Sequence, residues 1–171
     1  KRGKIEYNNP KEVVSMAEKL GVYIHIPFCK AKCDYCDFYS LPDKEGAMDD
    51  YLKALTTHIR ETAPLCKGWQ VDTVYIGGGT PSVFGAKRMV SLLKEIRRRF
   101  DVTRDAEVTC EANPESADRK FLTAVRRAGV NRLSLGMQSA CDGELKAVHR
   151  LHDFEQVTRA VAAARKAKLK N

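Results

Sequence analysis

Apolar and polar residues alternate in blocks along the chain: short apolar runs are followed by longer stretches with helical spacing. The runs predict strands over residues 22–26, 73–76, 107–111 and 132–136. Apolar positions three and four residues apart predict helices over residues 48–62, 86–100, 118–128 and from about 153 to the chain end. Strands that alternate with such helices favour an α/β fold with one parallel sheet and right-handed crossovers.

A helix-like lead precedes the first strand. Residues 13, 16, 17 and 20 are apolar with helical spacing, and Gly21 supplies a stop. We therefore expect two parts, a helical lead over residues 1–20 and an α/β core over residues 21–171.

Unusual residues gather where the predicted strands end. In chain order they are Cys29, Cys33 and Cys36, the glycine run 77–79, then Glu111 with Asn113, and finally Gln138. In parallel α/β folds the working groups lie on loops at the carboxyl ends of the strands. The sequence therefore predicts one shared active face.

The three clustered cysteines indicate a metal or redox site. A closed zinc site needs four protein ligands, and His25 is the nearest candidate for a fourth, although it lies inside an apolar run. A 4Fe-4S cluster held by three cysteines would leave one iron open to an outside molecule. A disulfide is the third alternative, but the first twenty residues do not resemble a signal peptide.

The glycine run fits neither the P-loop nor the dinucleotide-binding spacing. Three glycines could form a tight turn, or they could let bare backbone approach a ligand. Glu111 could be a surface carboxylate, but at a strand end it is well placed to accept hydrogen bonds from a ribose or an amine.

Composition narrows the class of protein. The chain has 171 residues, 43% of them apolar, and a net charge of +8. Its basic residues fall on predicted helices without interleaved aromatic residues, so nucleic-acid binding is not indicated. No apolar run reaches the length of a membrane span. We expect a cytoplasmic protein.

Four motifs together resemble the radical S-adenosylmethionine enzymes. They are YIHIPFC at 23–29 continued by Cys33 and Cys36, YIGGGTPS at 75–82, EANP at 111–114 and GVNRLSLGMQS at 129–139. Their order and spacing are similar to those of the oxygen-independent coproporphyrinogen III oxidase group. The resemblance covers about residues 21 to 168 and implies a TIM-like parallel barrel of six strand–helix units.

The resemblance also implies cofactors and residue roles. In that family three cysteines, here Cys29, Cys33 and Cys36, hold a 4Fe-4S cluster. S-adenosylmethionine fills the open iron, and the reduced cluster cleaves it to a 5′-deoxyadenosyl radical. By position, Tyr23 and Tyr35 would flank the cluster and the nucleotide, and Gly78, Gly79 and Thr80 would contact the methionine end. Glu111, Gln138 and Arg150 would complete the pocket around the amino acid and the ribose.

One local detail separates two functions within the group. The porphyrinogen oxidases carry a further cysteine two residues after the third, where this chain has Phe38. Cys36-Asp37-Phe38 is similar to the HemW-type heme chaperones, which implies a protein that binds heme and transfers it to an acceptor. The alternative is oxidative decarboxylation of coproporphyrinogen III. A colourless zinc scaffold remains a third reading.

The resemblance further implies that the chain is a piece of a longer protein. Only four of six strand–helix units are predicted, and the sequence ends where strand five would begin. Heme ligation is expected in the region beyond, and a fragment with an open sheet edge is expected to dissolve poorly. Expected partners are heme or a porphyrinogen, a heme-acceptor protein and an electron donor such as flavodoxin or ferredoxin. No catalytic side chain is assigned.

Three more cysteines lie outside the cluster motif. We expect structural roles for Cys66 and Cys110. Cys141 follows the fourth strand, on the predicted active face.

Overall fold

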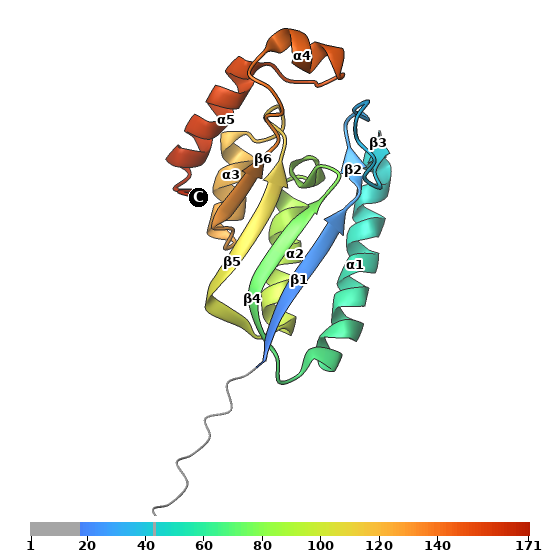
Figure 1. Cartoon of the computed structure of the whole chain (residues 1–171). Coiled ribbons are helices and arrows are strands. Elements are labelled where there is room, and N and C mark those ends of the chain that lie inside the picture. Colours follow the sequence, from blue (N-terminus) through green and yellow to red (C-terminus); the bar gives the residue numbers. More distant parts are fainter. Residues whose placement is uncertain (1–17, 43) are drawn as a thin grey trace, which may run out of the picture.

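The computed structural model describes residues 18–42 and 44–171. A parallel four-stranded sheet in the order β1-β4-β5-β6 forms its centre (Figure 1). The strands are β1 (Lys19–Ile26), β4 (Gln70–Gly78), β5 (Val102–Ala112) and β6 (Arg132–Leu135). The helices are α1 (Met48–Thr62), α2 (Ala86–Arg99), α3 (Arg119–Arg127), α4 (Asp142–Ala147) and α5 (Phe154–Lys166).

Shorter elements join these. The two-residue strands β2 (Phe28–Cys29) and β3 (Leu41–Pro42) pair with each other, and 3₁₀ turns cover Glu45–Ala47, Ala63–Cys66 and Pro81–Phe84. Each long strand is followed by helix, so the predicted α/β class with four strand–helix units is confirmed. No helix within the described ranges combines the length and apolar character needed to cross a bilayer.

The two faces of the sheet differ because side chains alternate along each strand. Ile24, Ile76 and Cys110 stand side by side in the register, are buried and belong to the core shared with the helices. Burial raises the pKa of the Cys110 thiol to about 12, which fits the structural role expected for it. Their strand neighbours Tyr23 and Tyr75 stack on each other on the opposite face.

The sequence prediction was wrong at the start of the first strand. Lys19 and Leu20, which were predicted to end the helical lead, pair with Gln70 and Val71 as part of β1. Strand pairing with a distant segment overrides a weak helical pattern here. The remainder of the lead, residues 1–17, lies outside the described residues, and the domain division at residue 20 stays a prediction.

The end of the chain follows the prediction more closely. Asp153 caps α5, with its carboxylate accepting from the Gln156 backbone N–H at 2.7 Å while the Gln156 side chain accepts from the Asp153 N–H at 3.1 Å. After α5 the chain returns to the sheet, where the Leu133 N–H donates to the Asn171 carbonyl at 3.0 Å. Helix α4 was not predicted, because its six residues are too few to show a helical period.

Candidate functional site

The loop between β1 and α1 carries the three clustered cysteines. The short β2–β3 pairing closes this loop. Inside it, the Lys32 ammonium donates to the Phe38 carbonyl at 2.7 Å and to the Ser40 hydroxyl at 3.2 Å. The six cysteines, all within the described ranges, are free thiols, so the disulfide alternative is wrong. Cys29, Cys33 and Cys36 are partly exposed and are available as ligands.

The glycine run ends β4 directly beside this loop. A Cβ on Gly78, which has φ of +110°, would lie 2.7 Å from the His25 ring. A Cβ on Gly79 would lie 2.9 Å from the Phe28 carbonyl oxygen and 3.0 Å from the Cys29 sulfur. Real Cβ contacts are longer, so only glycine lets the two segments approach this closely. The run therefore has a steric purpose beyond forming a turn.

Backbone hydrogen bonds fix this approach. The Gly79 N–H donates to the Ile26 carbonyl and the Thr80 N–H donates to the Phe28 carbonyl, both at 2.8 Å. The Thr80 hydroxyl then lies 3.4 Å from the Cys29 sulfur. The glycine run and the cysteine loop thus form one rigid wall.

Glu111, near the end of β5, faces this wall from the side. Its carboxylate accepts from the Tyr75 hydroxyl at 2.6 Å and from the Gly78 N–H at 3.1 Å. The hydrogen bond to Glu111 is also the largest of the effects that raise the pKa of Tyr75. Two donors fix the orientation of the carboxylate, which keeps further acceptor positions free.

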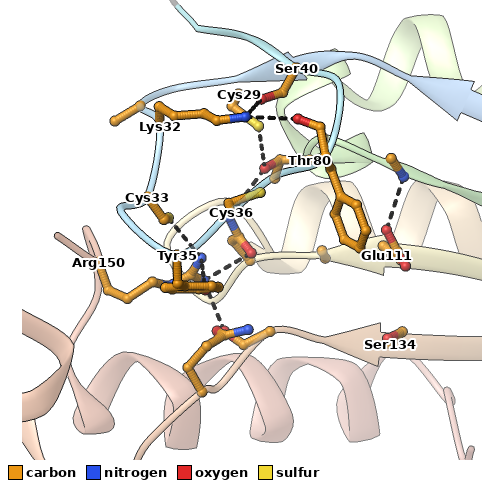
Figure 2. Close-up of a pocket in the computed structure, with 18 residues that line it drawn as sticks. Cys29, Lys32, Cys33, Tyr35, Cys36, Ser40, Thr80, Glu111, Ser134 and Arg150 are labelled. Carbon is orange, nitrogen blue, oxygen red and sulfur yellow. Dashed lines mark hydrogen bonds between the residues drawn. The ribbon is translucent and has the colours of Figure 1, made fainter. Parts of the chain in front are cut away.

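Arg150, from the segment between α4 and α5, completes the site (Figure 2). One terminal nitrogen lies 3.4 Å from the Cys33 sulfur and 3.4 Å from the Tyr35 hydroxyl. The other donates at 2.9 Å to the Asn113 side-chain oxygen and at 2.9 Å to the Gly136 carbonyl. Desolvation raises the pKa of Tyr35, and the nearby guanidinium partly opposes this rise. A fixed positive charge therefore stands beside a thiol of the loop.

These groups surround one cavity of about 200 Å³. Ten predicted site residues line it: Cys29, Cys33, Cys36, Tyr35, Gly78, Gly79, Thr80, Glu111, Gln138 and Arg150. Tyr23 is not among the lining residues: it stacks on Tyr75 below the cavity, and its hydroxyl bonds to the His25 Nδ1 at 3.0 Å. Cys141 caps the start of α4 and does not line the cavity either.

Sequence reasoning assigned no role at the site to three polar lining residues: Lys32, Ser40 and Ser134. Ser134 could have been found from its place in β6, one residue before the strand ends. Lys32 and Ser40 gave no such signal, because their inclusion depends on how the loop folds back on itself.

The zinc alternative does not fit the geometry. Both ring nitrogens of His25 are engaged: Nε2 donates to the Tyr39 carbonyl at 2.9 Å, so Nδ1 is left to accept from the Tyr23 hydroxyl. Within residues 18–42 and 44–171, no three His, Cys, Asp or Glu side chains converge on a single ion position. Three thiols spread around one cavity instead suit a larger sulfur-liganded group, and the side-chain-free glycine wall leaves room for a ligand beside it.

The chain belongs to the Radical SAM superfamily, whose sequence model matches residues 23–171. It is 41% identical over 146 residues to the heme chaperone HemW of Escherichia coli (strain K12), covering 85% of this chain and 39% of that protein. It is 42% identical over 153 residues to heme chaperone HemW of Mycobacterium tuberculosis (strain H37Rv), covering 88% and 38%. The chain thus spans about two fifths of the length of these relatives.

Solved structures agree. The coproporphyrinogen III oxidase HemN from Escherichia coli, described as a radical SAM enzyme, superposes with a TM-score of 0.82 at 32% identity, over 90% of this chain and 36% of that one. Methylornithine synthase (PylB) shares the fold alone, with a TM-score of 0.53 at 19% identity over 88% and 42%. The expected family and the partial parallel barrel of radical SAM type are confirmed.

Proposed function

We propose that this protein is a radical SAM heme chaperone that binds a 4Fe-4S cluster and S-adenosylmethionine at the cavity and transfers heme to acceptor proteins. One observation carries the proposal: three free thiols, a side-chain-free glycine wall, a carboxylate and a guanidinium line a single cavity.

Each group in the cavity has a chemical task in this proposal. Cys29, Cys33 and Cys36 would hold three irons as thiolates and leave the fourth iron open. The amino acid end of S-adenosylmethionine would fill that position, and the bound cluster would supply the electron that breaks the sulfonium carbon–sulfur bond. The chain's own part is orientation and shielding.

The remaining groups suit the polar ends of that ligand. Glu111 would accept from an amine or a ribose hydroxyl, since its carboxylate is already oriented by two donors. Arg150 would bind the carboxylate, which matches a guanidinium in charge and geometry. Tyr35 would flank the cluster and the nucleotide, and Gln138 would help to complete the pocket around the amino acid and the ribose.

Chaperone activity is favoured over the porphyrinogen oxidase. Phe38 lines the cavity in place of the additional cysteine of the oxidases, and relatives named heme chaperone match at 41–42% identity, against 32% for the coproporphyrinogen III oxidase structure. The proposal includes an electron donor such as flavodoxin or ferredoxin and a heme-acceptor protein. It places the protein in the cytoplasm, where thiols and a reduced cluster persist.

The test uses the full-length protein, reconstituted anaerobically with iron and sulfide. We expect about four irons and four sulfides per chain, an EPR spectrum that changes on adding S-adenosylmethionine, and heme binding by absorbance titration. Reductant, S-adenosylmethionine and coproporphyrinogen III are then added together. Formation of protoporphyrinogen would overturn the chaperone assignment, and absence of iron would overturn the cofactor assignment.

A further inference from the structure

A buried polar cluster adjoins the ligand cavity and shares Arg150 with it. It joins Glu115, from the turn between β5 and α3, to Arg150 and His152, which follow α4. The side chain of His152 is 0% exposed and that of Glu115 is 10% exposed. Charged groups this deep need partners, because an unpaired one loses its hydration without compensation.

Two atoms of this cluster lack such partners. The Nε of Arg150 and the Oε2 of Glu115 are both buried, and neither has a hydrogen-bond partner among the described residues. One is a donor and the other is an acceptor. Buried unpaired polar atoms are rare in native proteins and usually mark a bound water, an ion or a functional group.

His152 does not resolve the problem. Its Nε2 lies 3.1 Å from the Met137 carbonyl, which can only accept, so this nitrogen carries the proton. Nδ1 then presents a lone pair, which accepts from the Arg150 Nη2 at 3.3 Å. Glu115 Oε2 lies 3.6 Å from the same Nδ1 and meets a lone pair rather than an N–H. The imidazole therefore serves Arg150 and leaves the carboxylate unsatisfied.

Both unpaired side chains line one small cavity. Its volume is about 10 Å³, and Cys33 and Asn113 also line it. That is roughly the room one water molecule needs, and a buried water needs two or more polar partners. A water there can accept from the Arg150 Nε and donate to Glu115 Oε2, which satisfies both atoms at once.

We propose that one buried water joins Glu115 to Arg150 and that Glu115 is a positioning residue for this arginine. The carboxylate supplies the counter-charge, and the water fixes the guanidinium from behind. The terminal nitrogens are then held at Cys33, Tyr35 and Asn113. This inference rests on the proposed function, since it makes S-adenosylmethionine affinity depend on a residue outside the ligand cavity.

The first test is a high-resolution crystal structure of the full-length protein, which needs neither cluster nor ligand. We expect an ordered water within hydrogen-bonding distance of both Arg150 Nε and Glu115 Oε2. A direct pairing of Glu115 with Arg150 or with the neighbouring Lys30 would overturn the inference.

The second test measures the affinity of the cluster-loaded protein for S-adenosylmethionine by equilibrium binding. Glu115→Leu is expected to weaken binding about tenfold, as for the loss of one charge-assisted hydrogen bond. Glu115→Gln keeps an oxygen that accepts from the water and is expected to stay within about threefold of wild type. Glu155→Gln, on the exposed surface of α5, is the matched control and is expected to change nothing.

The outcomes separate the two proposals. Wild-type affinity in Glu115→Leu would overturn the positioning role. If Glu115→Leu fails to load the cluster, the positioning role is judged from the other two results. It stands if the ordered water is present and Glu115→Gln binds S-adenosylmethionine within about threefold of wild type, and it fails otherwise. If the wild-type protein itself binds no S-adenosylmethionine, the proposed function fails, and the water alone then decides this inference.

Discussion

The two ends of the sheet differ in how completely the charged side chains beside them are hydrogen-bonded. Near the amino ends of the strands, Glu95 on α2 accepts from three arginines: Arg60 at 2.9 Å, Arg99 at 3.0 Å and Arg98 at 2.5 and 3.1 Å. At the carboxyl ends, the thiols, Glu111 and Arg150 meet around a cavity, and two buried atoms of charged side chains, Arg150 Nε and Glu115 Oε2, have no hydrogen-bond partner among the described residues. A saturated carboxylate indicates a structural role, whereas spare hydrogen-bonding capacity indicates a ligand site.

The largest effect is expected at the carboxyl end, from the cysteines. Replacing Cys33 by alanine removes one of three ligands, and a cluster held at two points is not expected to survive purification. We expect loss of iron and sulfide, measured per chain after anaerobic reconstitution. Cys66→Ala, at the opposite end of the molecule, is the control. Equal iron content in both variants would contradict the ligand assignment.

The glycine wall should show the next largest effect. A methyl group on Gly79 would press on the Phe28 carbonyl and the Cys29 sulfur, and overpacking of this kind costs about 1–3 kcal/mol. Gly79→Ala is therefore expected to weaken S-adenosylmethionine binding by up to about a hundredfold. Gly46→Ala is the control, because nothing lies within 4 Å of its Cβ position. If Gly79→Ala and Gly46→Ala bind S-adenosylmethionine equally well, the residues around Gly79 shift to accommodate the added methyl group and the proposed steric role is wrong.

The comparison also explains what sequence alone could predict. The placing of the cysteines, the glycine run, Glu111 and Gln138 was predictable, because each lies at or after the end of a strand and parallel strands end at one edge. Tyr23 shows the limit: it lies in β1, none of whose residues lines the cavity, so its predicted place beside the nucleotide stays a prediction. The link from Glu115 to Arg150 gave no signal, because it depends on two turns 35 residues apart.

A substitution of Glu95, whose acceptor positions are filled, should change the stability of the fold and not the affinity for S-adenosylmethionine. Glu95→Ala leaves three partly exposed arginines without their shared partner, and we expect the free energy of unfolding to fall by ~2 kcal/mol. Chemical denaturation would measure this change, and S-adenosylmethionine affinity is expected to stay constant. If Glu95→Ala lowers S-adenosylmethionine binding by more than the loss of folded protein explains, the two ends of the sheet do not have separate roles.

The same carboxylate predicts a pH dependence. Hydrogen bonds from Arg98 and Arg60 lower the pKa of Glu95 from 4.5 to about 2. A lowered pKa in the folded state means that the carboxylate stabilises the fold fully above pH 4.5 and loses this contribution as the pH falls toward 2. The stability difference between wild type and Glu95→Ala should therefore shrink over that range. A constant difference would contradict the assignment.

The smallest effect is expected from a substitution that changes only the orientation of the Glu111 carboxylate. Tyr75→Phe keeps the ring stacked on Tyr23 but removes the hydroxyl that donates to Glu111 at 2.6 Å. The carboxylate then keeps only the Gly78 N–H as a donor and gains freedom to rotate. We expect S-adenosylmethionine binding about fivefold weaker, less than for the loss of a whole hydrogen bond to a charged group, because the Gly78 N–H still holds the carboxylate; cluster content should not change.

Tyr39→Phe provides the comparison for that measurement, because it also removes a phenol hydroxyl near the cysteine loop but from a residue that does not line the cavity. If both variants weaken binding equally, the hydroxyl of Tyr75 acts only through general packing. If only Tyr75→Phe weakens binding, the Glu111 carboxylate must be held in one orientation to bind the ligand. The free acceptor positions at this end of the sheet then act in a defined direction. Glu95 gives the opposite case, since its acceptor positions are already filled by arginines and leave a ligand nothing to bind.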